Sequence, residues 1–177
     1  MPAVTATENM ALMRAAFDAL RRKDMGACTS FMPPDFIINL VGMPYQMHGP
    51  DAWRKNAALF FKAFPDFQLV EEDMFAAGDR VAVRFRFTGT HLGEFLGTPA
   101  TGKRVDYQSY EIYRIADGKI AEEWICSDLL TILTQIGALE RGRLVSMWLA
   151  GYRVWFAAAL GLAGGVAAAL AATTLIA

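Results

Sequence analysis

The chain has 177 residues, a formal net charge of −1 at pH 7 and 54% hydrophobic residues. This length suits one domain of ordinary size with a sizeable core, and the near-neutral charge argues against a nucleic-acid-binding surface. The two cysteines, Cys28 and Cys126, fit neither a disulfide framework nor a metal site, so a reducing compartment is the simpler interpretation.

The N-terminal third predicts helices with one apolar face. Thr5 and Glu8 have the spacing of a capping box, and Met13 and Phe17 then recur on the same side of a helix. A short helical turn over residues 24–31 and a first strand over residues 36–42 follow. The sequence HGPD, which starts at His48, begins another helix whose aromatic residues include Trp53.

From residue 67 the pattern changes to strands. Residues 67–91 alternate as two strands around a turn at residues 77–79, and a glycine-rich loop leads to Arg104. A hairpin with an Asp117-Gly118 turn follows, and then a helix that ends near Leu139. Because helices precede a four-strand meander, we predict an α+β fold: a cone-shaped barrel made by a curved, mostly antiparallel sheet packed on N-terminal helices.

The second strand of that hairpin carries the main candidate residue. A side-chain period of two places Ile120, Glu122, Trp124, Cys126 and Asp128 on one face. That face ends in the carboxylate of Asp128. The same residue precedes an apolar helix, so it is also a candidate N-cap.

Several stretches together resemble one family. They are FPD, GDRVAVR, the loop that contains GTHLGEFLGTPATG, and IYRIADGKIAEEW with an aspartate four residues after its tryptophan. The chain from about Glu8 to Leu139 resembles the SnoaL-like polyketide cyclases, or ester cyclases, of the nuclear transport factor 2-like superfamily. The resemblance implies the cone-shaped fold, and because functions vary widely on this fold, activity must be argued from the pocket.

The resemblance also implies an activity. Polyketide cyclases of this family use an aspartate at the end of the last strand as general base and acid for an intramolecular aldol ring closure, with no metal or cofactor. Asp128 is the matching residue. Such a carboxylate needs an apolar setting to raise its pKa. A histidine on the neighbouring strand can assist it in the family, and residues 104–139 contain none.

Other residues are candidates for the substrate pocket. In the simplest hairpin register Trp124 faces Glu111 and Asp128 faces Tyr107, whereas a bulge would shift this pairing. Tyr107 or Tyr113 is a candidate donor to an enolate oxygen, with Glu111 as a second buried acid. The remaining predicted pocket residues come from the N-terminal half of the chain: Phe17, His48 and Trp53.

Three alternatives stay open. An isomerase of the ketosteroid type would use Tyr107 and Glu111 as an oxyanion hole, and an epoxide hydrolase would use Arg104, Asp106 and Asp128. A non-catalytic binding module for a hydrophobic small molecule would have much the same aromatic pocket. No metal or cofactor motif is found, so we expect neither.

The C-terminal tail has a different composition. After a connector over residues 140–153, residues 154–177 carry no charge and are long enough to form a membrane-anchoring helix. Arginines before this segment favour a cytoplasmic position for the domain of residues 1–139. The expected partners are therefore a hydrophobic substrate, membrane lipid and a second copy of the chain in a homodimer.

Overall fold

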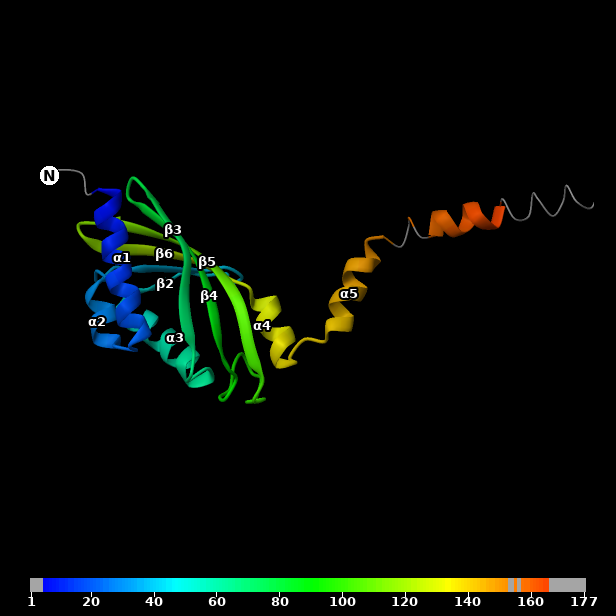
Figure 1. Ribbon diagram of the computed structural model, residues 1–177, viewed down its shortest axis with the longest axis horizontal. Helices are drawn as coiled ribbons and strands as arrows, with labels where there is room; N and C mark the ends of the chain where they lie inside the picture. Colours follow the sequence, from blue (N-terminus) through cyan, green and yellow to red (C-terminus); the bar gives the residue numbers. More distant parts are fainter. Residues whose placement is uncertain (1–4, 153–154, 156, 166–177) are drawn as a thin grey trace, which may run out of the picture. The chain divides into compact units, whose positions relative to one another are not determined.

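The computed structural model describes residues 5–152, 155 and 157–165, and the chain divides after Ala138 into two compact units. The first unit contains four helices and six strands (Figure 1). In chain order these are α1 (Ala6–Arg21), α2 (Met25–Ser30), β1 (Ile37–Leu40), β2 (Met47–His48), α3 (Gly49–Ala63), β3 (Gln68–Ala77), β4 (Arg80–Thr90), β5 (Arg104–Ala116), β6 (Lys119–Ser127) and α4 (Leu129–Ile136).

All six strands form one curved sheet in the order β2-β1-β6-β5-β4-β3. β1 pairs with β6 in parallel, and the other neighbours are antiparallel. The α+β class and the curved, mostly antiparallel sheet are confirmed, but the sheet does not close into the predicted barrel, because β2 and β3 are free edges among the described residues. Helices α1, α2 and α3 lie on one side of the sheet and complete the cone (Figure 1).

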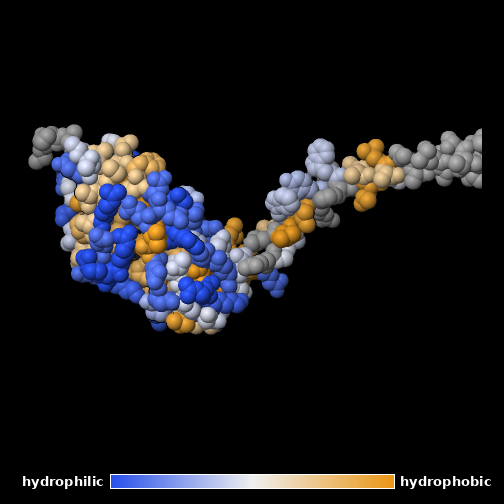
Figure 2. All heavy atoms as spheres, viewed as in Figure 1, coloured by the Kyte–Doolittle hydropathy of each residue, from blue (hydrophilic) through white to orange (hydrophobic). Residues whose placement is uncertain are grey.

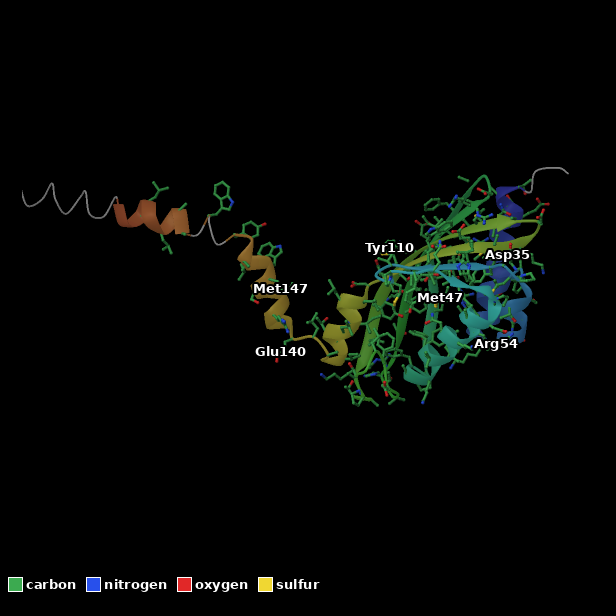
Figure 3. The ribbon with its side chains drawn as sticks, turned by 180° about the vertical axis from the view of Figure 1, so that it is seen from behind. Asp35, Met47, Arg54, Tyr110, Glu140 and Met147 are labelled. Atoms are coloured by element: carbon green, nitrogen blue, oxygen red, sulfur yellow. The ribbon has the colours of Figure 1, made fainter. Side chains whose placement is uncertain are left out.

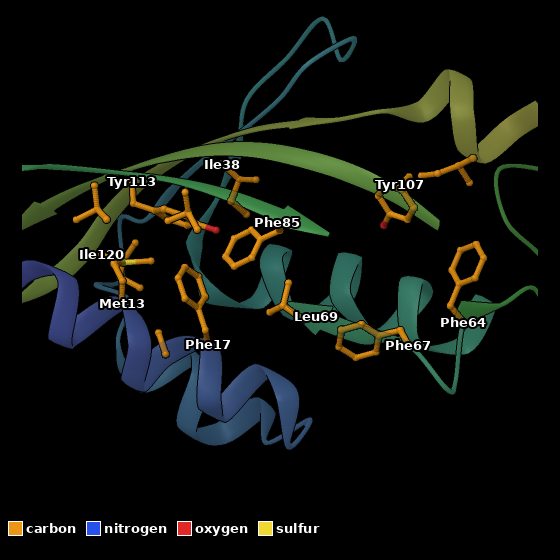
Figure 4. Packing of buried hydrophobic residues seen from close by; sticks show 14 of the residues in the cluster. Met13, Phe17, Ile38, Phe64, Phe67, Leu69, Phe85, Tyr107, Tyr113 and Ile120 are labelled. Atoms are coloured by element: carbon orange, nitrogen blue, oxygen red, sulfur yellow. The ribbon is translucent and has the colours of Figure 1, made fainter. Parts of the chain in front are cut away.

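The predicted start of α1 is confirmed. The Thr5 side chain accepts a hydrogen bond from the Glu8 backbone N–H, and the Glu8 carboxylate accepts one from the Thr5 N–H, which is the reciprocal capping box. The apolar stripe of α1 then packs on the sheet, where the Phe17 ring meets the edge of Phe85 at 4.7 Å between centroids. Figure 4 shows Phe17, Phe85 and Tyr113 at one end of this core and Phe64 and Phe67 at the other.

The Asp117-Gly118 turn is confirmed as a two-residue connection between β5 and β6. Both residues have positive φ, 50° and 69°, and Ala116 pairs directly with Lys119. Such turns match the right-handed twist of the two strands, and glycine adopts positive φ without steric cost. The hairpin therefore starts in the register that the sequence predicts.

The outer face of the sheet is mainly polar. Arg84 pairs with Glu72 and Arg86 with Asp106, as expected for side chains that alternate with core residues. Tyr110 of β5 also lies on this face, with 54% of its surface exposed (Figure 3). Figure 2 shows one face of the first unit, on which hydrophilic residues predominate and apolar residues form patches, including one near the N-terminus.

The second unit contains the helix α5 (Arg141–Ala150), and residues 157–165 are also helical. Within the described residues no helix is both long enough and apolar enough to span a bilayer. Much of the predicted anchor, residues 154, 156 and 166–177, lies outside the described residues.

Candidate active site

An extra residue in β6 decides which side chains of this strand face the helices. Arg114 pairs with Glu122, but its neighbour Ile115 pairs with Ile120, so Ala121 is a bulge. A bulge gives one strand two residues opposite one on its partner, and every later side chain moves to the other face. The residues after Ala121 therefore have the opposite orientation to that predicted.

The predicted cross-strand pairs are consequently wrong by one residue. Trp124 lies opposite Ile112, not Glu111, and the partner of Glu111 is Ile125. Trp124 does not line the cavity described below, and the Arg80 guanidinium lies over its ring at 4.8 Å. Beyond the bulge, the face that the sequence assigned to the pocket is the outer face of β6, whereas Ile120, which precedes the bulge, is buried and lines the cavity.

A cavity of about 490 Å³ lies between the sheet and the helices. This volume is in the range that binds drug-sized ligands. Its wall is mostly aromatic and aliphatic and comes mainly from α1, α3 and the inner faces of β4 to β6, with further residues from α2, α4, β1, β3 and the loop after β4. Among the lining residues are Met13, Phe17, Trp53, Phe60, Phe85 and Phe87. Phe17 and Trp53 thus lie where the sequence expected them.

A buried polar cluster on β5 and β6 interrupts this apolar wall. Glu111 accepts hydrogen bonds on both carboxylate oxygens, from the Ser109 hydroxyl at 2.7 Å on Oε1 and from the Tyr113 hydroxyl on Oε2. The Ser109 and Ser127 hydroxyls are 3.0 Å apart across the two strands. Glu111 is only 7% exposed and lines the cavity.

Burial and hydrogen bonding have opposite effects on Glu111. Burial raises the pKa of Glu111, whereas the hydrogen bonds from Tyr113 and Ser109 partly counteract this by stabilising the anion. Burial also raises the pKa of Tyr113 well above 10, with the nearby Glu111 carboxylate as a further cause, so this phenol stays a donor at neutral pH. A carboxylate with a raised pKa in an apolar cavity is suited to act as a general base.

A second carboxyl group lies on the adjacent strand. Glu123 of β6 pairs in register with Tyr113 and lines the same cavity with 3% of its surface exposed. Its Oε1 atom is buried and has no hydrogen-bond partner. Burial, and then repulsion from Glu111, raise the pKa of Glu123 well above its usual value.

Tyr107 lies farther along β5 on the same inner face. Its ring stacks on Phe87 with centroids 5.3 Å apart, and Figure 4 shows its hydroxyl pointing from β5 toward the α3 side of the core. Burial, and then the Glu111 carboxylate, raise the pKa of Tyr107. The phenol is therefore a neutral hydrogen-bond donor in the cavity wall.

The structure places Asp128 outside this cavity. Asp128 is exposed and is the N-cap of α4, where its carboxylate accepts hydrogen bonds from the Thr131 N–H at 3.0 Å and the Thr131 hydroxyl at 2.6 Å. It lines a polar hollow with Arg86 and Asp106 instead. The apolar environment expected around Asp128 is therefore not found.

Two further sets of candidates also lie away from the cavity. His48 is exposed immediately before α3 and makes no side-chain cap hydrogen bond. Arg104 and Asp106 are exposed, and the Asp106 carboxylate pairs with Arg86, which lowers the pKa of Asp106. An epoxide-opening triad of Arg104, Asp106 and Asp128 is thus not assembled in the apolar cavity.

Replacing Asp128 tests its role as a cap. Asp128→Ala removes both acceptors for Thr131, so we expect a loss of about 1 kcal/mol in the free energy of unfolding. Asp128→Asn should unfold close to the wild type, because asparagine caps helices as well as aspartate does. Urea denaturation measures both, and equal destabilisation by alanine and asparagine would contradict the cap.

Sequence reasoning missed Glu123, Ser109 and Ser127. The side-chain period of two that places Glu122 and Trp124 on one face of the strand leaves Glu123 on the other. The useful signal was that Glu123, Ile125 and Ser127 form an equally regular alternation in the other phase. Only the bulge at Ala121 selects between these two phases.

The sequence profile of the SnoaL-like polyketide cyclases matches residues 10–136, a range that includes all the described residues that line the cavity. The chain belongs to this family.

Two curated relatives share 30% identity with this member of the family over 93 residues, or 52% of the chain. They are aklanonic acid methyl ester cyclase DnrD of Streptomyces peucetius and aklanonic acid methyl ester cyclase DauD of Streptomyces sp. strain C5. The match spans 64% of the first relative and 58% of the second, so less than two thirds of either.

Solved structures of similar proteins cover more of the chain. AclR of Streptomyces galilaeus, provisionally described as a hydroxylase, shares 32% identity with a TM-score of 0.69, over 76% of this chain and 99% of its own. A protein of Jannaschia sp. CCS1, provisionally described as a SnoaL-like polyketide cyclase, shares 28% identity with a TM-score of 0.71, over 78% and 96%. TsrD of Streptomyces laurentii shares 26% identity with a TM-score of 0.69, over 77% and 99%.

Proposed function

We propose that this SnoaL-like protein is a cofactor-independent enzyme that closes a ring in, or isomerises, a hydrophobic polyketide-like carbonyl compound, with Glu111 as the general base. The observation that carries the proposal is the position of Glu111. Its carboxylate is buried in an apolar cavity, and both of its oxygens accept hydrogen bonds from neighbouring hydroxyls. The resemblance had suggested Asp128 for this role.

Ring closure then needs only acid–base chemistry. Glu111 removes a proton from the carbon next to a carbonyl group, and the C–H electron pair forms an enolate. The enolate carbon attacks a second carbonyl carbon of the same molecule, which makes the new C–C bond. The resulting alkoxide takes the proton back from Glu111, so the product is an isomer of the substrate.

The cavity suits a large and apolar substrate. Its wall combines aromatic rings such as Trp53, Phe60 and Phe87 with a buried polar cluster around Glu111. Polar groups placed at one point of an apolar pocket fix the orientation of a ligand. The names of the two curated relatives specify a methyl ester, aklanonic acid methyl ester, as the compound that they cyclise, and we infer a hydrophobic ester or ketone here.

The test compares two carboxylates. Aklanonic acid methyl ester is incubated with the wild type, Glu111→Gln and Asp128→Asn, and the cyclised product is followed by chromatography. The proposal expects turnover to be lost in the Glu111 variant and kept in the Asp128 variant. The reverse result would return the catalytic role to Asp128.

A non-catalytic binding module is the second candidate. It is favoured by the exposed position of Asp128, the residue to which the resemblance assigned catalysis. A binding module would take up hydrophobic ketones with equal affinity in the wild type and Glu111→Gln, and neither protein would convert them. Binding is measured by the quenching of tryptophan fluorescence, since Trp53 lines the cavity.

A membrane location is the finer part of the proposal and rests on the uncharged sequence of residues 154–177. Leu162→Arg in the full chain should release the protein from membranes, because an arginine near the centre of a span costs on the order of 3 kcal/mol. Fractionation of cells measures the change, with Leu130→Arg on α4 as the matched control. Equal membrane fractions for both variants would contradict the anchor.

The predicted homodimer stays a prediction.

A further inference from the structure

The buried carboxyl group of Glu123 has no role in the steps described so far. It is brought to the cavity by the bulge at Ala121, and one of its oxygens is sealed from solvent without a hydrogen-bond partner. An unpartnered polar atom in an apolar environment costs free energy, and more so if it carries a charge. This arrangement therefore favours the neutral, protonated form of the Glu123 carboxyl group.

The hydrogen bonds around the two glutamates differ. Both oxygens of Glu111 receive a donor, which suits an ionised carboxylate because that form only accepts. The Tyr113 hydroxyl lies on the strand opposite Glu123 but donates to Glu111. Glu123 thus has no donor from Tyr113, and a protonated acid needs fewer donors than a carboxylate does.

No cation in the described part of the chain lines the cavity to balance two negative charges. The titratable groups of its wall are Tyr107, Glu111 and Tyr113 on β5, Cys28 on α2, Glu94 in the loop after β4, and Glu123 itself. Helices α1, α3 and α4 contribute only uncharged residues to it. Two adjacent carboxyl groups without a cation do not both ionise readily, so one of them retains its proton.

We propose that Glu123 is the protonated member of the pair and that it donates a hydrogen bond to the carbonyl oxygen of the substrate while Glu111 removes the proton from the adjacent carbon. This inference rests on the proposed function. As the enolate forms, negative charge develops on that oxygen and the proton of Glu123 moves toward it. The proton returns to Glu123 when the carbonyl group forms again, so the enzyme is unchanged after each turnover.

The assignment also defines the substrate class. The carbonyl group that is activated must be uncharged, as in a ketone or an ester, because it accepts a hydrogen bond between two carboxyl groups. A substrate with a free carboxylate would enter a cavity that has acidic groups and no basic one among its described lining residues. The site therefore selects neutral, enolisable carbonyl compounds and rejects the corresponding free acids.

The raised pKa of Glu123 agrees with this geometry. Burial is the first cause and the Glu111 carboxylate the second, so removal of the Glu111 charge leaves the main cause in place. The proton should consequently remain on Glu123 in Glu111→Gln. Glu123→Gln has no carboxyl group at residue 123 and therefore cannot carry this proton.

Infrared spectroscopy tests the location of the proton without any turnover. Full-length wild type at pH 7 should show the C=O stretch of a protonated carboxyl group, and this band should persist in Glu111→Gln and disappear in Glu123→Gln. A band that is lost in Glu111→Gln but kept in Glu123→Gln would overturn the assignment. Absence of the band from the wild type would do the same.

A stability measurement keeps the test independent of the spectrum. Folding raises the pKa of Glu123. At a pH above the pKa of the unfolded state, the unfolded chain releases this proton readily whereas the folded state holds it. The free energy of unfolding therefore falls as the pH rises. Glu123→Gln removes this penalty. Its melting temperature should therefore exceed that of the wild type at pH 8 by several degrees, with the difference vanishing near pH 4. No gain at pH 8 would contradict a buried neutral acid.

The catalytic part is tested with a donor-retaining variant. Glu123→Gln keeps an N–H donor and should retain at least tenfold more turnover than Glu123→Leu, which has none. Equal turnover in the two variants would exclude donation by residue 123. If Glu111→Gln turns over like the wild type, the proposed function fails, and the infrared band still shows which residue holds the proton.

Discussion

Glu111→Gln is expected to lower kcat/KM for ring closure by about a thousandfold, the usual contribution of a positioned general base. Glutamine has nearly the shape of glutamate but cannot accept a proton at neutral pH. The neighbours Ser109 and Tyr113 can still hydrogen-bond to its amide. Ligand affinity should therefore stay within a few-fold of the wild type, and this separates lost chemistry from lost binding.

The pH profile gives a second signature of the same residue. The base must be ionised to act, and burial raises its pKa above the ordinary 4.5, so activity should rise with pH through a value above 4.5. If Glu123 must stay protonated, activity falls again at higher pH and the profile is bell-shaped. The acidic limb should disappear from the residual activity of Glu111→Gln.

Asp128→Asn is the control for this experiment, because it changes a carboxylate that caps α4 outside the cavity. Its turnover and pH profile should match the wild type. If kcat/KM falls about a thousandfold in Asp128→Asn and stays unchanged in Glu111→Gln, the assignment of Glu111 as the general base is wrong. Thermal melts of both variants confirm that each is folded before rates are compared.

The second large effect concerns Gly93 in the loop between β4 and β5, which should not accept any side chain. A Cβ atom on residue 93 would lie 2.2 Å from the backbone oxygen of Lys62 at the end of α3. The N–H groups of Leu92 and Gly93 both donate to the Ala63 carbonyl, so the loop is held at this distance. We expect Gly93→Ala to lower the free energy of unfolding by about 3 kcal/mol, as for other overpacking substitutions.

Gly26→Ala is the matched control for Gly93→Ala. Its added Cβ would meet only the Asp24 carboxylate at 3.5 Å, an ordinary contact, and Gly26 lies inside α2, where alanine is favoured. Chemical denaturation should therefore separate the two substitutions clearly. A Gly93 variant as stable as the Gly26 variant would show that the loop moves away from α3 without cost.

The same loop carries Phe95 and Leu96, which line the cavity. Any shift forced by Gly93→Ala should therefore weaken binding of a hydrophobic ligand as well as stability. If Gly93→Ala loses about 3 kcal/mol in the free energy of unfolding but binds the hydrophobic ligand as tightly as the wild type, the distortion lies on the α3 side of the contact.

Local sequence signals predicted the elements of the first unit well. The Thr5–Glu8 spacing identified the start of α1, and the Asp117-Gly118 pair identified the tight turn. Tyr107, Glu111 and Tyr113 lie on the buried face of β5, although the cross-strand pairing from which the sequence proposed Tyr107 and Glu111 is not the observed one. Each of these features depends on a few neighbouring residues, which is why the sequence contains the information for them.

Tertiary structure decided the rest. The phase of β6 depends on one bulged residue, Ala121, since both alternations of that strand contain glutamate and apolar side chains. In the observed phase Glu122 pairs with Arg114 on the outer face, and Glu123 turns into the cavity. These choices depend on packing across the whole sheet, so only the folded molecule brings two acids together and leaves Asp128 as a helix cap. The sequence by itself determined the family, the hairpin turn and most of the helices and strands, because neighbouring residues suffice for them, but it did not predict the two-residue strand β2. The open sheet, the apolar cavity and the identity of its acids required strands and helices that are distant in the chain to meet.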